Sequence, residues 1–475
     1  MSDLSLHGLL SNVAWGIATG HVGAAPPAAA ARRAIPEPSA SVRARRWSED
    51  LREVTGAAPG VHRLVAGWQY LQPDGPRGWN AAALGRCDRA VDAILARGRR
   101  PGLTLLHLEL PSWLEDAGGW LSRDTAAHYA DYVAKLRDRL ADRVELWITS
   151  SDLSAVTLTE YIAGLAPNGR CLGAAGLPAV HHLLLAAGRG AQVLADAPGK
   201  VGTTVTLIGG YPATTDPYDR LAVERMESWT TRLYLDPMLL GTHMVTEDGG
   251  CPVEDSGCVR EGDLGTIATA QDVLGLSWHF PSSIAAPENL PRSFPAQSRF
   301  EALNEVNRLL ARLGFAVVPF DGVETSASGW PIMPEGLADA VASLHDLYGD
   351  LLPPLYITDN GLADPDDEGC DAQRRSSLRA RLAWLAGAMA RGVDVFGYEY
   401  WSKRDNFDWR VSYSKLYGIA VSERQERAEP QPEPPRDWVH EDVFAPSPGP
   451  AGVRGAGRGP LAARAAAATA RASGR

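Results

Sequence analysis

The chain has few of the features that mark membrane, disulfide-rich or nucleic-acid-binding proteins. Its five cysteines are scattered and form no CxxC pair, which argues against a zinc site or a disulfide framework. No stretch reaches the roughly 18 apolar residues of a membrane helix, and the N-terminus lacks a secretory-signal pattern. The net charge of −11 argues against a phosphate-backbone partner. We therefore expect a cytoplasmic protein with no nucleic-acid and no membrane partner.

Several motifs that bind cofactors or metals are missing as well. The sequence contains no P-loop, no GxGxxG after a strand, no GxSxG elbow and no HExxH pair. We therefore expect no cofactor and no metal. Any chemistry would then come from ordinary side chains.

What the chain does have is the length and composition of one large enzyme domain. It contains 475 residues, of which 45% are hydrophobic and 22% are charged, as in ordinary globular proteins. Its 14 tryptophans outnumber its 13 tyrosines and 8 phenylalanines. Indole rings can stack on sugars as well as fill a core, so this excess fits both uses.

Short apolar runs alternate with amphipathic stretches along the chain. We expect strands at 12–19, 62–68, 102–109, 144–150, 201–207, 272–280, 354–358 and 394–401. Helical spacing appears at 80–98, 123–141, 177–194, 334–348 and 371–391. Such alternation predicts a parallel α/β fold, but the pattern alone fits an open sheet and a closed barrel equally.

The last residues differ in composition from the rest. Residues 446–475 are rich in Ala, Gly, Pro and Arg and contain no acidic or aromatic residue. Such a segment cannot bury enough apolar surface to order itself. We therefore expect one domain over 1–445 and a disordered tail over 446–475.

Two acidic residues stand at the ends of predicted strands. Asp152 follows the fourth strand, and Asp359 follows the seventh. Parallel α/β enzymes place their chemistry at the carboxyl ends of strands. Cleavage of a glycosidic bond needs two carboxyl groups, one to protonate the leaving oxygen and one to attack or to activate water. The two positions therefore favour glycoside hydrolysis.

From about Val13 to Ile419 the chain resembles the β-glycosidases of glycoside hydrolase family 1. The motifs that carry the resemblance follow the family's order: Trp15–Thr19 (WGxAT), His62-Arg63 with Trp68 (YRF…W), His107–Pro111 (HWDLP), Leu114–Trp120 (LEDxGGW), Trp401-Ser402 with Asp405–Trp409 (WSLxDNFEW) and Tyr413–Gly418 (YSKRFG).

The resemblance implies a single (β/α)8 TIM barrel that hydrolyses an O-glycosidic bond of a small glycoside or sugar-like ligand. It places Asp152 and Asp359 at the catalytic positions, where the family has Glu. The implied substrate-binding residues are His107, Ser151, Trp401, Asp408, Trp409 and Tyr413. The implied supporting residues are Arg63, His279 and Glu399.

Shortened carboxylates would change the reaction. Each Glu-to-Asp change removes one methylene and withdraws the carboxylate by about 1 Å. Retaining enzymes hold the two carboxyl groups about 5–5.5 Å apart, and inverting enzymes about 6.5–9.5 Å. We therefore hypothesise inversion, with Asp152 as general acid and Asp359 as general base. The family's sugar-binding Gln and Trp fall at Gly23 and Leu108, so activity on plain glucosides should be weak.

Three charged residues are new relative to the pattern of the family. Glu399 lies two residues before Trp401 and shares its face of the last strand. A carboxylate inside a barrel is costly unless it is paired, so Glu399 is either a partner of Arg63 or a replacement catalytic acid. Lys403 and Arg404 either attract an anionic substrate or form a solvated loop.

Three functions fit these observations. The first is a β-glycoside hydrolase with shortened carboxylates, favoured because both strand ends keep an acid. The second is a non-hydrolytic binder of a sugar or small molecule, and the third is a repurposed barrel enzyme acting on a natural product. The sequence predicts no oligomeric state.

Overall fold

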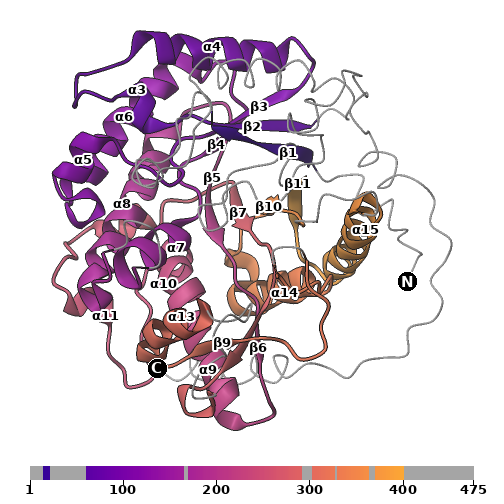
Figure 1. Cartoon of the computed structure of the whole chain (residues 1–475). Coiled ribbons are helices and arrows are strands. Elements are labelled where there is room, and N and C mark those ends of the chain that lie inside the picture. The colour runs from indigo at the N-terminus through magenta and orange to yellow at the C-terminus, as the bar shows by residue number, and fades with distance from the viewer. Residues whose placement is uncertain are drawn as a thin grey trace, which may run out of the picture.

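The computed structural model describes residues 14–21, 60–164, 170–290, 302–326, 329–362 and 370–400. Eight parallel strands in this part of the chain close into a barrel (Figure 1). The barrel strands are β1 (Ala14–His21), β2 (Val61–Val65), β3 (Arg100–Thr104), β4 (Leu146–Ile148), β5 (Lys200–Thr206), β7 (Val273–Ser277), β10 (Leu355–Asn360) and β11 (Val395–Tyr400). All eight predicted strands are confirmed, and the barrel decides between the two architectures that the pattern allowed.

The strands follow chain order around the barrel, and β1 closes it by pairing with β2 on one side and β11 on the other. Parallel pairing turns every carboxyl end toward the same rim. Between the strands, Val61, Leu146, Ile148, Val273 and Tyr356 form the buried interior cluster. The interior is thus filled by side chains, and chemistry is left to the rim.

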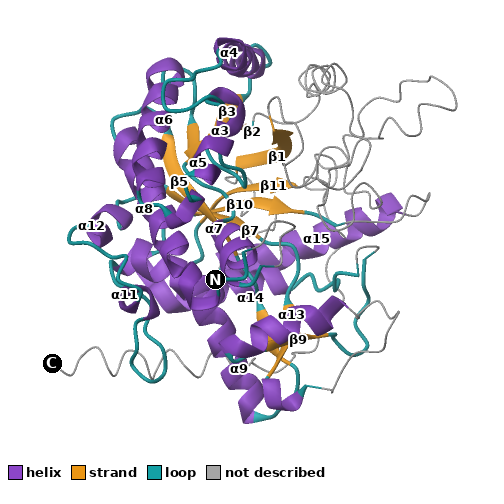
Figure 2. Cartoon of the chain, turned by 60° about the vertical axis from the view of Figure 1, so that its left-hand side comes forward, coloured by secondary structure: helices purple, strands orange, loops and turns teal. Residues whose placement is uncertain are grey.

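Helices lie along the outside of the barrel, to its left and below it in Figure 2. The described helices are α3 (Trp68–Leu71), α4 (Ala81–Leu95), α5 (Ser112–Asp116), α6 (Asp124–Leu140), α7 (Leu153–Val156), α8 (Leu177–Leu194), α9 (Pro217–Glu227), α10 (Leu233–Leu235), α11 (Pro252–Asp255), α12 (Asp263–Ile267), α13 (Ala302–Leu310), α14 (Gly336–Tyr348) and α15 (Cys370–Met389). The five predicted helices are confirmed as α4, α6, α8, α14 and α15. None of the helices in the described ranges combines the length and apolar character needed to cross a membrane.

Apolar spacing explains why these helices pack where they do. Helix α4 begins at Ala81, and the Asn80 side chain caps it by accepting from the backbone N–H of Ala83. Its buried residues, among them Leu84, Val91 and Ile94, recur at helical spacing and cover one side of the sheet. The same logic holds for α6 and α8, which pack against each other along the barrel wall.

A small second sheet was not predicted. It contains β6 (Gly210–Pro212), β8 (Ser282–Ala285) and β9 (Ala316–Val318), with β6 and β8 parallel and β8 and β9 antiparallel. Helices α9 and α13 lie against it at the lower edge of Figure 1. The predicted tail over 446–475 lies outside the described residues, so the domain boundary at 445 and the cytoplasmic location stay predictions.

Candidate active site

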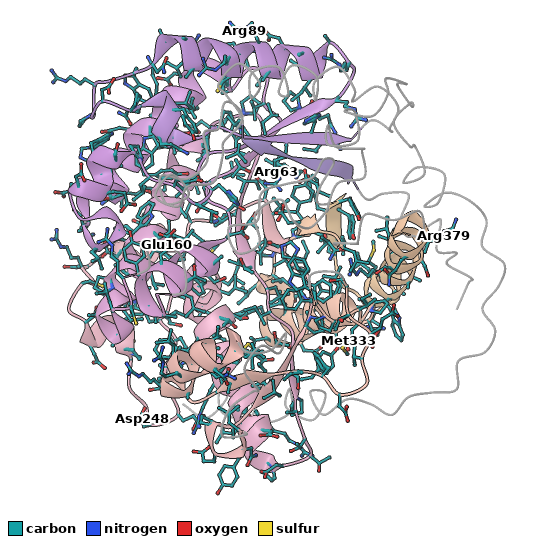
Figure 3. The ribbon with its side chains drawn as sticks, viewed as in Figure 1. Arg63, Arg89, Glu160, Asp248, Met333 and Arg379 are labelled. Carbon is teal, nitrogen blue, oxygen red and sulfur yellow. The ribbon has the colours of Figure 1, made fainter. Side chains whose placement is uncertain are left out.

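Arg63 organises the rim of the barrel from β2. Its Nε donates to Glu399 Oε2 at 2.8 Å, and its Nη1 donates to Thr104 Oγ1 at 3.0 Å. Its Nη2 donates to the Thr358 carbonyl at 2.8 Å and to the two carboxylate oxygens of Asp359 at 3.2 and 3.3 Å. The side chain lies among the barrel strands (Figure 3). One guanidinium therefore joins β2 to β3, β10 and β11.

Asp152 sits where the chain leaves β4 and enters α7. Its backbone is left-handed, with φ 57° and ψ 43°, a region that Asp tolerates better than most residues. Its Oδ2 lies 3.2 Å from His107 Nε2, and its Oδ1 accepts from Thr206 Oγ1 at 3.0 Å. The Ser151 hydroxyl donates to Oδ2 at 3.4 Å. Donors from the ends of three neighbouring strands thus fix this carboxylate.

Glu399 forms an ion pair with Arg63, one of the two roles that the sequence left open for it. Its side chain is fully buried, with 0% exposed. Its second oxygen, Oε1, accepts a hydrogen bond from the Tyr356 hydroxyl. The Tyr356 ring fits beside β11 only because Gly397 has no side chain: an added Cβ would meet two ring carbons at 2.5 Å. Glu399 is thereby held by two donors deep in the barrel.

The two aspartates sit in different electrostatic surroundings. Burial raises the pKa of Asp359, Arg63 lowers it, and the charges of Asp152 and Glu399 raise it again, to about 6. Burial alone would also raise the pKa of Asp152, but the His107 hydrogen bond and charge and the Thr206 hydrogen bond lower it to about 2. Asp152 is therefore the stronger acid of the pair, because its pKa is lowered while that of Asp359 is raised.

The neighbouring groups respond to the same charges. Burial would lower the pKa of His107, but Asp152 outweighs burial and the pKa is raised. Burial raises the pKa of Glu399, and Arg63 and Tyr356 offset part of that rise. Burial would lower the pKa of Arg63, yet Glu399 and Asp359 raise it, so the guanidinium stays charged.

Exposure separates the groups that ligand can reach from those that it cannot. The side chains of Asp152 and Asp359 are each 14% exposed, and that of His107 is 27% exposed. Ser151 is fully buried, and its hydroxyl contacts Asp152 and not the exposed rim. His279 follows β7, with its ring 5.3 Å from that of Trp330, and its charge acts on Asp152.

The remaining predicted site residues cannot be placed. Trp401, Asp408, Trp409 and Tyr413, together with Gly23, Lys403 and Arg404, lie outside the described residues. Their assignments stay predictions. Among the described residues, no group of three or more His, Cys, Asp or Glu side chains is arranged to hold a metal ion.

Sequence reasoning missed two residues that touch the carboxylates. Thr206 ends β5, and Tyr356 lies on β10 three residues before Asp359. A signal for Thr206 existed, since it ends a strand next to the one that leads to Asp152. Tyr356 had no such signal, because its contact depends on the space beside Gly397.

Asn360 was also missed, although it directly follows Asp359. It is fully buried and donates from Nδ2 to the Trp278 carbonyl at 2.8 Å. Its Oδ1 accepts from Arg381 Nη1 at 3.2 Å and from the Tyr398 hydroxyl. Asn360 thus ties β10 to β7, β11 and α15, and it fixes the strand end that carries Asp359.

A closed parallel barrel with one carboxylate at the carboxyl end of β4 and another at that of β10 has the architecture of a TIM-barrel glycoside hydrolase. Residues 32–438 match glycosyl hydrolase family 1. The chain belongs to glycoside hydrolase family 1, and it is a glycoside hydrolase of the β-glycosidase type.

Relatives and solved structures agree with this assignment. The chain is 33% identical over 389 residues to a thermostable β-glucosidase B of Thermobispora bispora, covering 78% of this chain and 74% of the relative. It is 32% identical to a bifunctional β-D-glucosidase/β-D-fucosidase of Bifidobacterium breve, over 80% and 84% of the two chains. The psychrophilic β-glucosidase of Micrococcus antarcticus matches with a TM-score of 0.79 and 28% identity, over 94% and 99% of the chains.

A further solved structure shows a sugar-like ligand on a similar fold. The Thermotoga maritima family 1 glycoside hydrolase, complexed with a cyclophellitol analogue that mimics the transition state, matches with a TM-score of 0.76 and 25% identity. The match covers 91% of this chain and 97% of the Thermotoga maritima chain. A glycoside or sugar-like small molecule is therefore the class of ligand that the comparisons support.

Proposed function

We propose that this protein hydrolyses β-O-glycosides with Asp152 and Asp359 as its reacting carboxyl groups. The observation that carries the proposal is the pair itself: two partly exposed carboxyls at one rim, each held by a basic side chain, with the charge of Asp152 raising the pKa of Asp359. Glycosidic cleavage requires two carboxyl groups with different pKa values, so that one can donate a proton while the other is ionised.

The names of the relatives support a substrate class. Similar proteins are named β-glucosidases and a β-glucosidase/β-fucosidase, so an aryl β-glucoside or β-fucoside is the first substrate to try. His107 is the proposed sugar-binding residue within the described rim, and Trp401, Asp408, Trp409 and Tyr413 are proposed to complete the site. Ser151 was predicted to bind substrate, but it is fully buried and its hydroxyl donates to Asp152, so we assign it instead to holding Asp152 in place. Arg63 and His279 are proposed as supporting residues.

The shortened acids set the expected rate and outcome. A reacting group displaced by about 1 Å can cost roughly a hundredfold in rate, so turnover of plain glucosides should be weak. The same shortening favours a gap wide enough for a water between the two carboxyls, and hence inversion at the anomeric carbon.

The test is nitrophenol release from a panel of aryl β-glycosides by the wild type and by Asp359→Ala. Asp138→Ala is the control, because Asp138 is an exposed acid on α6 that pairs with its neighbour Arg137. We expect release by the wild type and the control and none by Asp359→Ala. Release by all three would place the reaction elsewhere. No release by any would leave a sugar binder or a catalyst of different chemistry.

A further inference from the structure

The end of β10, which carries Asp359, departs from a regular strand ladder on both of its sides. The pairing register shifts between Ile357 and Asp359 on the side of β7, and between Ile357 and Asn360 on the side of β11. Such irregularities occur often beside active sites, where they turn a side chain in a new direction. The direction of Asp359 therefore depends on contacts outside the ladder.

The backbone of Trp278, the residue after β7, supplies two of these contacts. Its N–H donates to the Asp359 carbonyl at 3.0 Å, and its carbonyl accepts from Asn360 Nδ2 at 2.8 Å. Asn360 is fully buried and Trp278 is 1% exposed, so water does not reach these groups. The position of Trp278 and the orientation of the Asn360 amide together decide where the end of β10 lies.

Arg381 on α15 contacts both of these residues. Its Nη1 donates to Asn360 Oδ1 at 3.2 Å and to the Gly361 carbonyl at 3.3 Å. Its guanidinium carbon lies over the Trp278 ring, 5.7 Å from the ring centre. A guanidinium is planar, so it can donate from its edge while its face covers an aromatic ring. One side chain from α15, which lies beside β10 and β11 in Figure 1, thus contacts the amide and the ring together.

The donors around Asn360 fix which end of its amide faces Trp278. Oδ1 accepts from Arg381 and also from the Tyr398 hydroxyl. A flipped amide would turn its NH2 group toward these two donors and its oxygen toward the Trp278 carbonyl, and it would lose all three hydrogen bonds. Arg381 therefore keeps Nδ2 directed at Trp278.

Building on the proposed hydrolysis, we propose that Arg381 is a positioning residue for Asp359, because it orients Asn360 and Trp278, which hold the end of β10. Burial, which raises the pKa of Asp359, and Arg63, which lowers it, have the largest effects on that carboxyl. Arg381 is therefore expected to act through geometry and not through charge. A reacting group displaced by about 1 Å can lose roughly a hundredfold in rate.

Amide hydrogen exchange tests this positioning without turnover. The Trp278 N–H reports on the end of the β7–β10 pair, and the Leu274 N–H, which donates to the Pro354 carbonyl at 3.0 Å, reports on its start. We expect the exchange rate of Trp278 relative to that of Leu274 to rise tenfold or more in Arg381→Met. Leu385→Ala removes buried packing from the same helix. It controls for a general loss of stability and should leave the ratio within twofold of the wild type.

Turnover of an aryl β-glycoside tests whether the positioning serves the reaction. We expect Arg381→Met to lower kcat tenfold or more and to change KM less than twofold, because Arg381 acts on the reacting carboxyl and not on the sugar. Leu385→Ala should keep kcat within twofold of the wild type. Arg379→Met makes the same substitution at an exposed position of α15 (Figure 3) and should also keep kcat within twofold.

Arg381→Lys separates geometry from charge, and it decides the question if Arg381→Met does not fold. Lysine keeps the positive charge, but its single ammonium cannot reach both acceptors while it covers the Trp278 ring. We expect a threefold or greater loss of kcat and a higher exchange ratio. A folded Arg381→Met or Arg381→Lys protein with the kcat or the exchange ratio of the wild type overturns the proposal. A wild type that cleaves no glycoside would refute the proposed function, and the exchange ratio would still show whether Arg381 holds the end of β10.

Discussion

Removal of one hydroxyl should show how strongly the rim holds Asp152. Thr206→Val keeps the shape of the side chain but deletes the donor that lies 3.0 Å from Asp152 Oδ1. A hydrogen bond to a charged group contributes about 1.5–3 kcal/mol, and about 1.4 kcal/mol corresponds to one pKa unit. The pKa of Asp152 should therefore rise by about one to two units, and the folded state should lose a similar free energy at pH 7.

The strand supplies a matched control. Thr204 lies two residues earlier on β5, is fully buried, and has a hydroxyl with no hydrogen-bond partner among the described residues. Thr204→Val should therefore be neutral or slightly stabilising. For a urea m value of about 3 kcal/mol/M, the expected loss of free energy corresponds to an unfolding midpoint about 0.5–1 M lower for Thr206→Val than for the control. A larger m value would make the difference smaller.

The free energy of unfolding that Thr206→Val loses relative to Thr204→Val should be larger at pH 7 than at pH 3. The pKa of Asp152 is lowered to about 2 by the fold, against about 3.9 in an unfolded chain. Its stabilisation is then present above about pH 4 and is lost as the pH falls toward 2. Urea unfolding at pH 7 and pH 3 should show the gap between the two variants narrowing. Equal midpoints at pH 7 would refute the role of Thr206.

Three further outcomes follow from the structure. Gly397→Ala should lower the melting temperature, because its Cβ would meet the Tyr356 ring at 2.5 Å and overpacking costs about 1–3 kcal/mol; unchanged melting would contradict the close contact. Asn360→Ala should lower it by a similar amount, since Arg381 and Tyr398 lose a buried acceptor. NMR of the first sugar released from a β-glycoside should show the α-anomer, and a β-anomer would exclude inversion.

Much of the fold could be predicted because parallel barrel strands are apolar on both faces. Runs such as 102–109 and 272–280 stand out on that basis. The small sheet could not be found in this way, since β6 and β9 are three residues long and have no measurable alternation. Such strands form because the loops of the barrel bring them together.

The candidate site was partly predictable for a related reason. A carboxylate such as Glu399 inside a barrel is costly unless it is paired, so the sequence could offer a pair with Arg63 as one of two roles for Glu399. The competition between Glu399 and Asp359 for that cation could not be predicted, because it depends on which guanidinium nitrogen each carboxylate reaches. The left-handed backbone of Asp152 also left no trace in the sequence.

That backbone has a consequence for restoring the usual catalytic glutamate at residue 152. Asp and Asn accept a left-handed conformation because their short side chains bond locally, whereas Glu gains no such compensation and pays about 1–2 kcal/mol. A single Asp152→Glu reversion would also push the carboxylate past His107 and Thr206, which are spaced for the shorter side chain. The reach of a glutamate therefore does not fit the turn at residue 152 as it stands, and engineering toward faster turnover should vary that turn together with the side chain.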